Sequence, residues 1–157
     1  MSRKIVIFLG FVLGILFVTS MASAQQSPMA KKLIVYGDIV SFASSSDPLS
    51  CTAKSRYNPG DAVGFRITVI DPLTGKVVET AEAVVHVTYG GKTEDVAMRY
   101  RGAGSHPHPG MWTAKWVIPD NAPTGIVKYT ITATDSGRSG TFEPFQVDAS
   151  MLTIVAK

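Results

Sequence analysis

The sequence lacks the residues that several common functional classes require. One cysteine in 157 residues excludes an internal disulfide framework and any metal or iron–sulfur centre built from several cysteines. Charged residues make up only 17% of the chain and the net charge is +3, whereas soluble domains average about 25% charged residues. Nucleic-acid-binding proteins usually present a dense basic face, so this composition argues against a nucleic-acid partner.

Catalytic motifs are missing as well. The chain has no Gly-rich phosphate loop, no nucleophile elbow and no His-Glu-x-x-His segment. Nucleophilic catalysis needs a serine or cysteine beside a positioned base. The sequence shows no such pairing for any serine or for the cysteine. We therefore do not expect an enzyme.

Residues 1–24 have the layout of a cleaved secretory signal peptide. Arg3 and Lys4 precede an apolar run at 5–18, and an Ala-Ser-Ala sequence ends the segment. The run is shorter than the ~20 residues that a membrane-spanning helix needs. We expect cleavage, a periplasmic or secreted protein, and no membrane span after cleavage. The mature chain keeps 13 of the 15 Lys and Arg residues against 12 Asp and Glu, so it is nearly neutral.

Apolar and polar residues alternate with a period of two along the mature chain. Such alternation predicts strands with one buried face. The five clearest runs are 63–69, 84–89, 96–101, 112–118 and 127–134, and shorter β-prone pieces lie at 33–36, 38–42, 141–147 and 151–155. After a polar lead at 25–32, residues 33–157 are therefore expected to form one all-β domain, an antiparallel sandwich of about seven to nine strands.

Turn sequences separate these runs. The Asp-Pro-Leu-Thr-Gly segment at 71–75 places Pro and Gly where a turn requires them, and the two glycines at 90–91 predict a primed hairpin turn. Loops are expected at 119–125 and 135–140. The Ser-rich stretch 41–55 predicts a surface loop.

The stretch 57–69 and the turn that follows it resemble a known domain type. A Tyr-x-Pro-Gly-Asp turn leads into a strand, and an Asp-x-x-x-Gly-Lys turn follows at 71–76. This arrangement resembles the macroglobulin-type bacterial immunoglobulin-like domain, and the segment 116–135 is similar to strands of the same family. The resemblance covers about 57–147 and implies an immunoglobulin-like sandwich. The thioester Cys-Gly-Glu-Gln segment is absent, so the trapping activity of macroglobulins is not implied.

The most distinctive polar feature is the pair His106 and His108, separated by one proline. Two neighbouring imidazoles can bind copper or zinc, and the alternative is a solvated polar loop. Cys51 is either a small buried hydrophobe, the partner of an intermolecular disulfide, or a further ligand. The candidate metal ligands are therefore His106, His108 and Cys51.

A blue-copper site is rejected on residue order. Such a site needs two His and one Cys, often with an axial Met. The inventory permits this set through Cys51, His86, His106, His108, Met98 and Met111. In cupredoxins one His comes first, and Cys, His and Met follow in one late loop, whereas here the cysteine precedes every histidine.

Trp112 and Trp116 share one face of an expected strand. They could form an aromatic platform for a sugar or peptide, but Ala114 and Ile118 lie on the same face and favour a core position.

These observations favour an exported single-domain immunoglobulin-like binding or accessory module of the cell envelope. It would pair with another exported or envelope protein through a sheet face or a free edge, without a cofactor. The alternative is a periplasmic metal-binding or redox accessory protein that binds copper or zinc through the His106/His108 loop.

Overall fold

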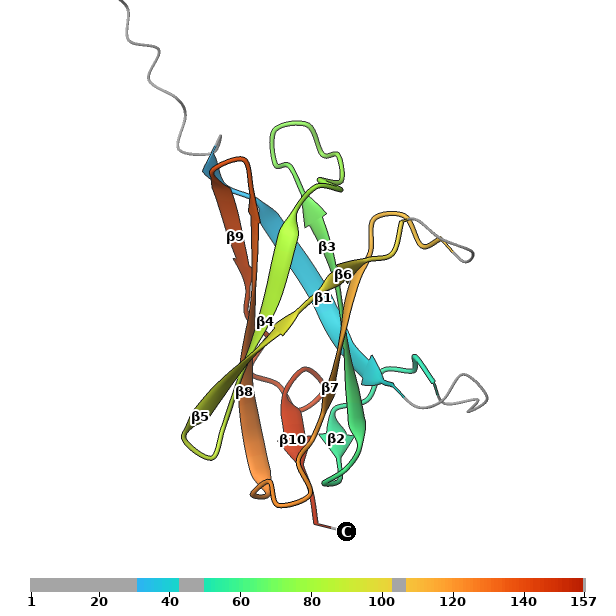
Figure 1. Cartoon of the computed structure of the whole chain (residues 1–157), viewed down its shortest axis with the longest axis vertical. Coiled ribbons are helices and arrows are strands. Elements are labelled where there is room, and N and C mark those ends of the chain that lie inside the picture. Colours follow the sequence, from blue (N-terminus) through green and yellow to red (C-terminus); the bar gives the residue numbers. More distant parts are fainter. Residues whose placement is uncertain (1–30, 43–49, 103–106, 157) are drawn as a thin grey trace, which may run out of the picture.

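The computed structural model describes residues 31–42, 50–102 and 107–156 of this chain, which form an all-β fold (Figure 1). The expected signal peptide lies outside the described residues, as does most of the polar lead. The described residues contain no helix long and apolar enough to cross a membrane. The strands are β1 (Ile34–Ser41), β2 (Arg56–Tyr57), β3 (Ala62–Ile70), β4 (Glu82–Tyr89), β5 (Lys92–Ala97), β6 (Arg99–Tyr100), β7 (Trp112–Val117), β8 (Gly125–Asp135), β9 (Arg138–Phe142) and β10 (Leu152–Ile154).

The strands form two sheets that enclose one core, as in a β-sandwich. The first sheet has the order β1-β3-β7-β6, and the second has the order β2-β10-β8-β4-β5 with β9 paired to β8. Every strand pair is antiparallel except β2 with β10, which is parallel. The predicted all-β sandwich is therefore confirmed, and its strand pairing is antiparallel apart from this short pair.

The core is built from the alternating faces that the sequence predicted. On β3, Val63, Phe65, Ile67 and Val69 are at most 2% exposed. They face apolar side chains of β8, and the rings of Phe65 and Tyr129 lie 5.2 Å apart. Burial of these faces supplies the main stabilisation of the fold.

Both tryptophans belong to this core, which confirms the core interpretation. Trp112 is 1% exposed and Trp116 is 4% exposed. Each indole finds an acceptor: Trp112 Nε1–H donates to the Ala81 carbonyl at 3.1 Å, and Trp116 Nε1–H donates to Glu94 at 2.7 Å. A buried indole needs such a partner to offset the loss of hydration.

The expected run at 96–101 is two strands. Residues up to Ala97 pair with β4 in the second sheet, and Arg99–Tyr100 pair with β7 in the first. Between them the Met98 N–H donates to the Ala83 carbonyl at 2.9 Å. The chain therefore crosses from one sheet to the other without losing its alternation. With the expected pieces 33–36 and 38–42 joined in β1, and with β2 added, the described residues form ten strands.

The expected loop 135–140 is largely a tight hairpin. β8 and β9 pair up to Asp135 and Arg138, and the two residues between them, Ser136 and Gly137, have φ of 48° and 76°. The glycines at 90–91 also have positive φ, 52° and 75°, which confirms the primed turn between β4 and β5.

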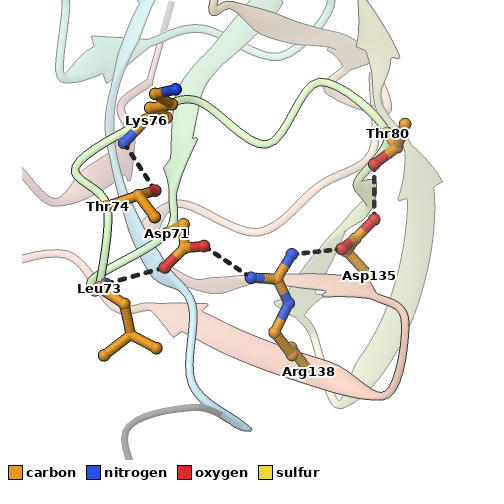
Figure 2. A network of polar contacts seen from close by, with 7 residues as sticks. All are labelled: Asp71, Leu73, Thr74, Lys76, Thr80, Asp135 and Arg138. Atoms are coloured by element: carbon orange, nitrogen blue, oxygen red, sulfur yellow. Dashed lines mark hydrogen bonds and ion pairs between the residues drawn. The ribbon is translucent and has the colours of Figure 1, made fainter.

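A polar network joins the turn that follows β3 to the β8–β9 hairpin (Figure 2). Arg138 donates to Asp71 at 3.0 Å and to Asp135 at 2.5 Å, and Thr80 donates to Asp135 at 2.6 Å. Asp71 also accepts the Leu73 N–H at 2.8 Å, which shapes the 71–75 turn. One guanidinium thus connects the β3–β4 turn to the β8–β9 hairpin.

Candidate functional site

The candidate site lies on the outer face of the four-stranded sheet. The strand register places Val40, Gly64 and Lys115 in one row across this sheet, and Arg66 with Thr113 in the next. Two cavities of about 260 and 300 Å³ open on this face, and Arg66 and Met111 line both of them. In Figure 1 the described parts of the β1–β2 and β6–β7 connections lie on the same side of the molecule. Residues from both connections line the smaller cavity.

Gly64 allows the smaller cavity to have an aromatic wall. A Cβ at this position would lie 2.8 Å from both Phe42 Cδ2 and Val40 Cγ2. Such contacts are too short for a side chain, so glycine lets the Phe42 ring lie against β3. The Lys115 ammonium lies 5.7 Å from the centre of the same ring.

Cys51 forms a second wall of this cavity. The cysteine N–H donates to the Ser41 carbonyl at 2.8 Å, and the Ser41 N–H donates to the Thr52 carbonyl at 2.9 Å. These bonds hold the segment against the end of β1, where Val40 and Ala53 form a bridge. The Cys51 residue is exposed and its φ is 64°. The interpretation of this residue as a small buried hydrophobe is therefore wrong.

His108 and Met111 come from one turn of the β6–β7 connection. The Met111 N–H donates to the His108 carbonyl at 3.3 Å, and Gly110 has φ 81°. With Pro109 before this glycine, the four residues have the features of a type II turn, which needs positive φ at its third position. The His108 N–H donates to the Arg101 carbonyl at 2.7 Å, which holds the turn against the end of β6.

Arg66 is the main charged group between the two cavities. Its Nε and Nη2 donate to the Asp38 carboxylate at 2.9 and 2.5 Å, and its Nη1 donates to the Cys51 carbonyl at 3.5 Å. The hydrogen bond to Asp38 and the charge of its carboxylate raise the pKa of Arg66, and burial opposes this rise. The guanidinium is therefore held beside the cysteine by an ion pair.

The structure brings two of the three candidate metal ligands together. Cys51 and His108 line the same cavity, and His106 lies outside the described residues. His86 lies on the outer face of the other sheet, where its ring nitrogens contact Asp95 at 2.7 Å and Thr132 at 2.8 Å. Within the described ranges, no three His, Cys, Asp or Glu side chains gather in a way that could hold a metal ion.

The sequence did not indicate which residues share this cavity. Arg66 and Phe42 belong to ordinary strand patterns, and nothing local marks them as cavity walls. The Pro-Gly pair after His108 was a usable signal for the turn that places Met111 near the histidine. The approach of Cys51 to that turn results from strand order alone.

No protein-family model matches this chain, and no curated protein matches it. The function is therefore inferred from the residues of this face and from the sequence.

Proposed function

We propose that the protein is an exported single-domain binding module of the cell envelope with a macroglobulin-type immunoglobulin-like fold. It pairs with another exported or envelope protein through the outer face of the four-stranded sheet. The signal-peptide pattern at 1–24 supports a periplasmic or secreted location. The two-sheet fold and the 57–76 motif support the immunoglobulin-like assignment.

The difference between the two outer faces is the observation that carries the proposal. The four-stranded sheet exposes Ile34 at 49% and Tyr36 at 53%, next to the two cavities. The outer face of the other sheet exposes Ile126 at 60% near the start of β8, but most of its outward side chains are threonines. These are Thr88, Thr93, Thr130, Thr132, Thr134, Thr141 and Thr153. Aromatic and apolar side chains beside concave surfaces are typical of protein interfaces.

Two of the described edge strands, β5 and β1, are poorly suited to pairing with a partner strand. β5, at an edge of the larger sheet, carries Lys92, Glu94 and Asp95, and charged edges resist strand addition. The outer edge of β1 is occupied near both ends by bridges, Lys32 with Ser139 and Val40 with Ala53. A sheet face is therefore the better candidate for the interface.

Site-specific photo-crosslinking tests the interface. A photoreactive amino acid replaces Tyr36 on the proposed face, or Thr130 on the opposite face, in the full chain exported by its native host. We expect one defined adduct from position 36 only, and loss of that adduct when Ile34→Asp is added. Equal crosslinking from both positions, or an adduct that Ile34→Asp does not change, would contradict the proposed face.

Cell fractionation and mass measurement test export. We expect the exported chain to begin at Gln25, and deletion of residues 1–24 to retain the protein in the cytoplasm. A cytoplasmic full-length chain of unchanged mass would refute the location.

A further inference from the structure

We propose that Cys51, His108 and Met111 form a binding site for monovalent copper at the smaller cavity of the four-stranded sheet. This site does not depend on the proposed protein partner. It uses two of the residues that the sequence singled out and adds a thioether from the same turn.

The backbone places two of the donors close together. His108 and Met111 are the first and last residues of the turn closed by the bond between the Met111 N–H and the His108 carbonyl. The Cα atoms of such residues are less than about 7 Å apart. Pro109 and the positive φ of Gly110 restrict this backbone, so little conformational freedom is lost when both side chains bind one ion.

The third donor lines the same small cavity. Cys51 is held there by its backbone bond to Ser41, in a segment that is remote in sequence from the turn. The cavity volume is about 260 Å³, and all three donors line it. Binding of one ion by all three donors requires rotation of these side chains about their own bonds.

The types of donor select the metal. A thiolate and a thioether are soft ligands that favour Cu(I), and an imidazole also suits copper. Zinc in proteins takes four or three ligands from Cys, His, Asp and Glu. Only Cys51 and His108 among the cavity-lining residues belong to that set, and the Asp38 carboxylate is bound to Arg66. Hard cations such as Mg²⁺ or Ca²⁺ would have no carboxylate from the lining residues.

The charge around the cavity also favours a monovalent ion. Arg66 and Arg101 line the cavity, and only Arg66 is neutralised there by a described ion pair. A Cu(I)–thiolate pair has no net charge, whereas a divalent ion on one thiolate would leave a positive charge beside the guanidinium groups.

Binding is a proton exchange without electron transfer. The Cys51 thiol loses its proton to solvent as the sulfur–copper bond forms, and copper enters and stays as Cu(I). The imidazole and the thioether donate lone pairs and change neither their protonation nor their oxidation state.

Competition with a chromophoric Cu(I) chelator under anaerobic, reducing conditions tests this site in the processed chain. We expect one Cu(I) per chain. Cys51→Ser should weaken binding more than ~100-fold, because removal of even an outer-shell partner of a metal ligand can cost 10–100-fold. His108→Ala and Met111→Leu should each weaken it at least about tenfold. X-ray absorption should detect both sulfur and nitrogen neighbours, with fewer sulfurs in Met111→Leu.

Matched controls use the same residue types outside the cavity. His86→Ala and Met98→Leu should leave the Cu(I) affinity unchanged, because His86 lies on the opposite sheet and Met98 packs against the core. Circular dichroism establishes that each variant keeps its β structure, and His108→Gln replaces the alanine variant if that one unfolds. The proposal is overturned by Cu(I) binding that depends on Cys51 alone, by loss of affinity in the control variants, or by Zn(II) binding more tightly than Cu(I).

Discussion

At the scale of single residues, two Pro-Gly turns shape the backbone near functional and structural side chains. Gly60 and Gly110 have φ of 87° and 81°, a region that other L-residues enter only at a cost. In the first turn Asp61 accepts the Asn58 N–H at 3.0 Å, as expected for the acidic residue of the Tyr-x-Pro-Gly-Asp motif. The second turn presents His108 and Met111.

Replacing each of these two glycines by alanine distinguishes an effect on folding stability from an effect on Cu(I) binding. Gly60→Ala and Gly110→Ala should each lower the free energy of unfolding by about 1 kcal/mol, because alanine is strained at positive φ. Only Gly110→Ala should also weaken Cu(I) binding, since the turn that pairs His108 with Met111 is distorted. Urea unfolding and the chelator competition measure the two effects. Equal Cu(I) affinity in both variants would show that the turn geometry does not matter for binding.

The Glu94 carboxylate is a second residue with a testable role. It accepts hydrogen bonds from Tyr89 Oη at 2.6 Å and from Trp116 Nε1 at 2.7 Å, and the bond from Tyr89 is the largest cause of its lowered pKa. A carboxyl group whose pKa is lower in the folded state stabilises the fold above its unfolded pKa of about 4.3. This contribution is lost as the pH falls through the folded pKa.

Glu94→Gln should therefore destabilise the protein by about 1 kcal/mol at pH 7, because one acceptor oxygen becomes a donor. The difference from the unsubstituted chain should shrink as the pH falls below about 4, because the carboxyl group of the unfolded chain is protonated there before that of the folded chain. Urea unfolding at pH 7 and at pH 3.5 measures this, with Glu82→Gln as an exposed control on the neighbouring strand. A difference that is independent of pH would exclude the ionised carboxylate as its source.

At the scale of elements, β8 offers a direct comparison between a buried and an exposed isoleucine. Ile131 is 0% exposed and Ile126 is 60% exposed. Ile131→Ala should cost about 2–5 kcal/mol through lost burial and the cavity left behind, while Ile126→Ala should stay within about 0.5 kcal/mol. Chemical denaturation of both variants measures this. Similar losses would contradict the assignment of the two faces of the strand.

The turn that follows β3 and the β8–β9 hairpin, which Figure 2 shows joined by Arg138, should both lose stability when this arginine is replaced. Arg138→Ala should lower the melting temperature, and Arg138→Lys should recover little, because an ammonium cannot contact two carboxylates through a planar fork. In combination with Asp71→Asn, the loss should be smaller than the sum of the two single losses, since both changes remove the same contact. Thermal melts at low and high salt should show a smaller effect at high salt. Additive losses that do not change with salt would contradict the network.

The elements that could be predicted from the sequence are those whose alternation is continuous and ends at a turn residue. β3, β4, β7 and β8 lie close to the predicted runs for this reason. The division of 96–101 into β5 and β6 was missed because the side chains keep alternating through Met98 while the chain changes sheets. The two-residue strand β2 has too few residues to show any period, and its pairing with β10 is a contact of the folded chain.

At the scale of the whole molecule, the cavity exists because the strand order β1-β3-β7-β6 brings two distant connections to one sheet face. Local sequence could indicate that His108 lies in a turn, but it could not indicate that Cys51 lines the same cavity. Sheet order depends on long-range pairing, which short-range residue patterns do not encode. The fold class could therefore be predicted, whereas the composition of the cavity required the structure.

Because the cavity walls come together only in the folded chain, Cu(I) should stabilise the whole molecule. A ligand that binds only the folded state at 100 times its dissociation constant adds about 2.7 kcal/mol to the free energy of unfolding. We expect a matching rise in melting temperature for the unsubstituted chain and for Met98→Leu, under anaerobic conditions with excess Cu(I). Cys51→Ser should show no rise. A rise that persists without the cysteine would place the stabilising ion elsewhere. No rise in the unsubstituted chain, despite tight binding, would mean that the unfolded chain binds Cu(I) equally well and that the folded cavity does not organise the site.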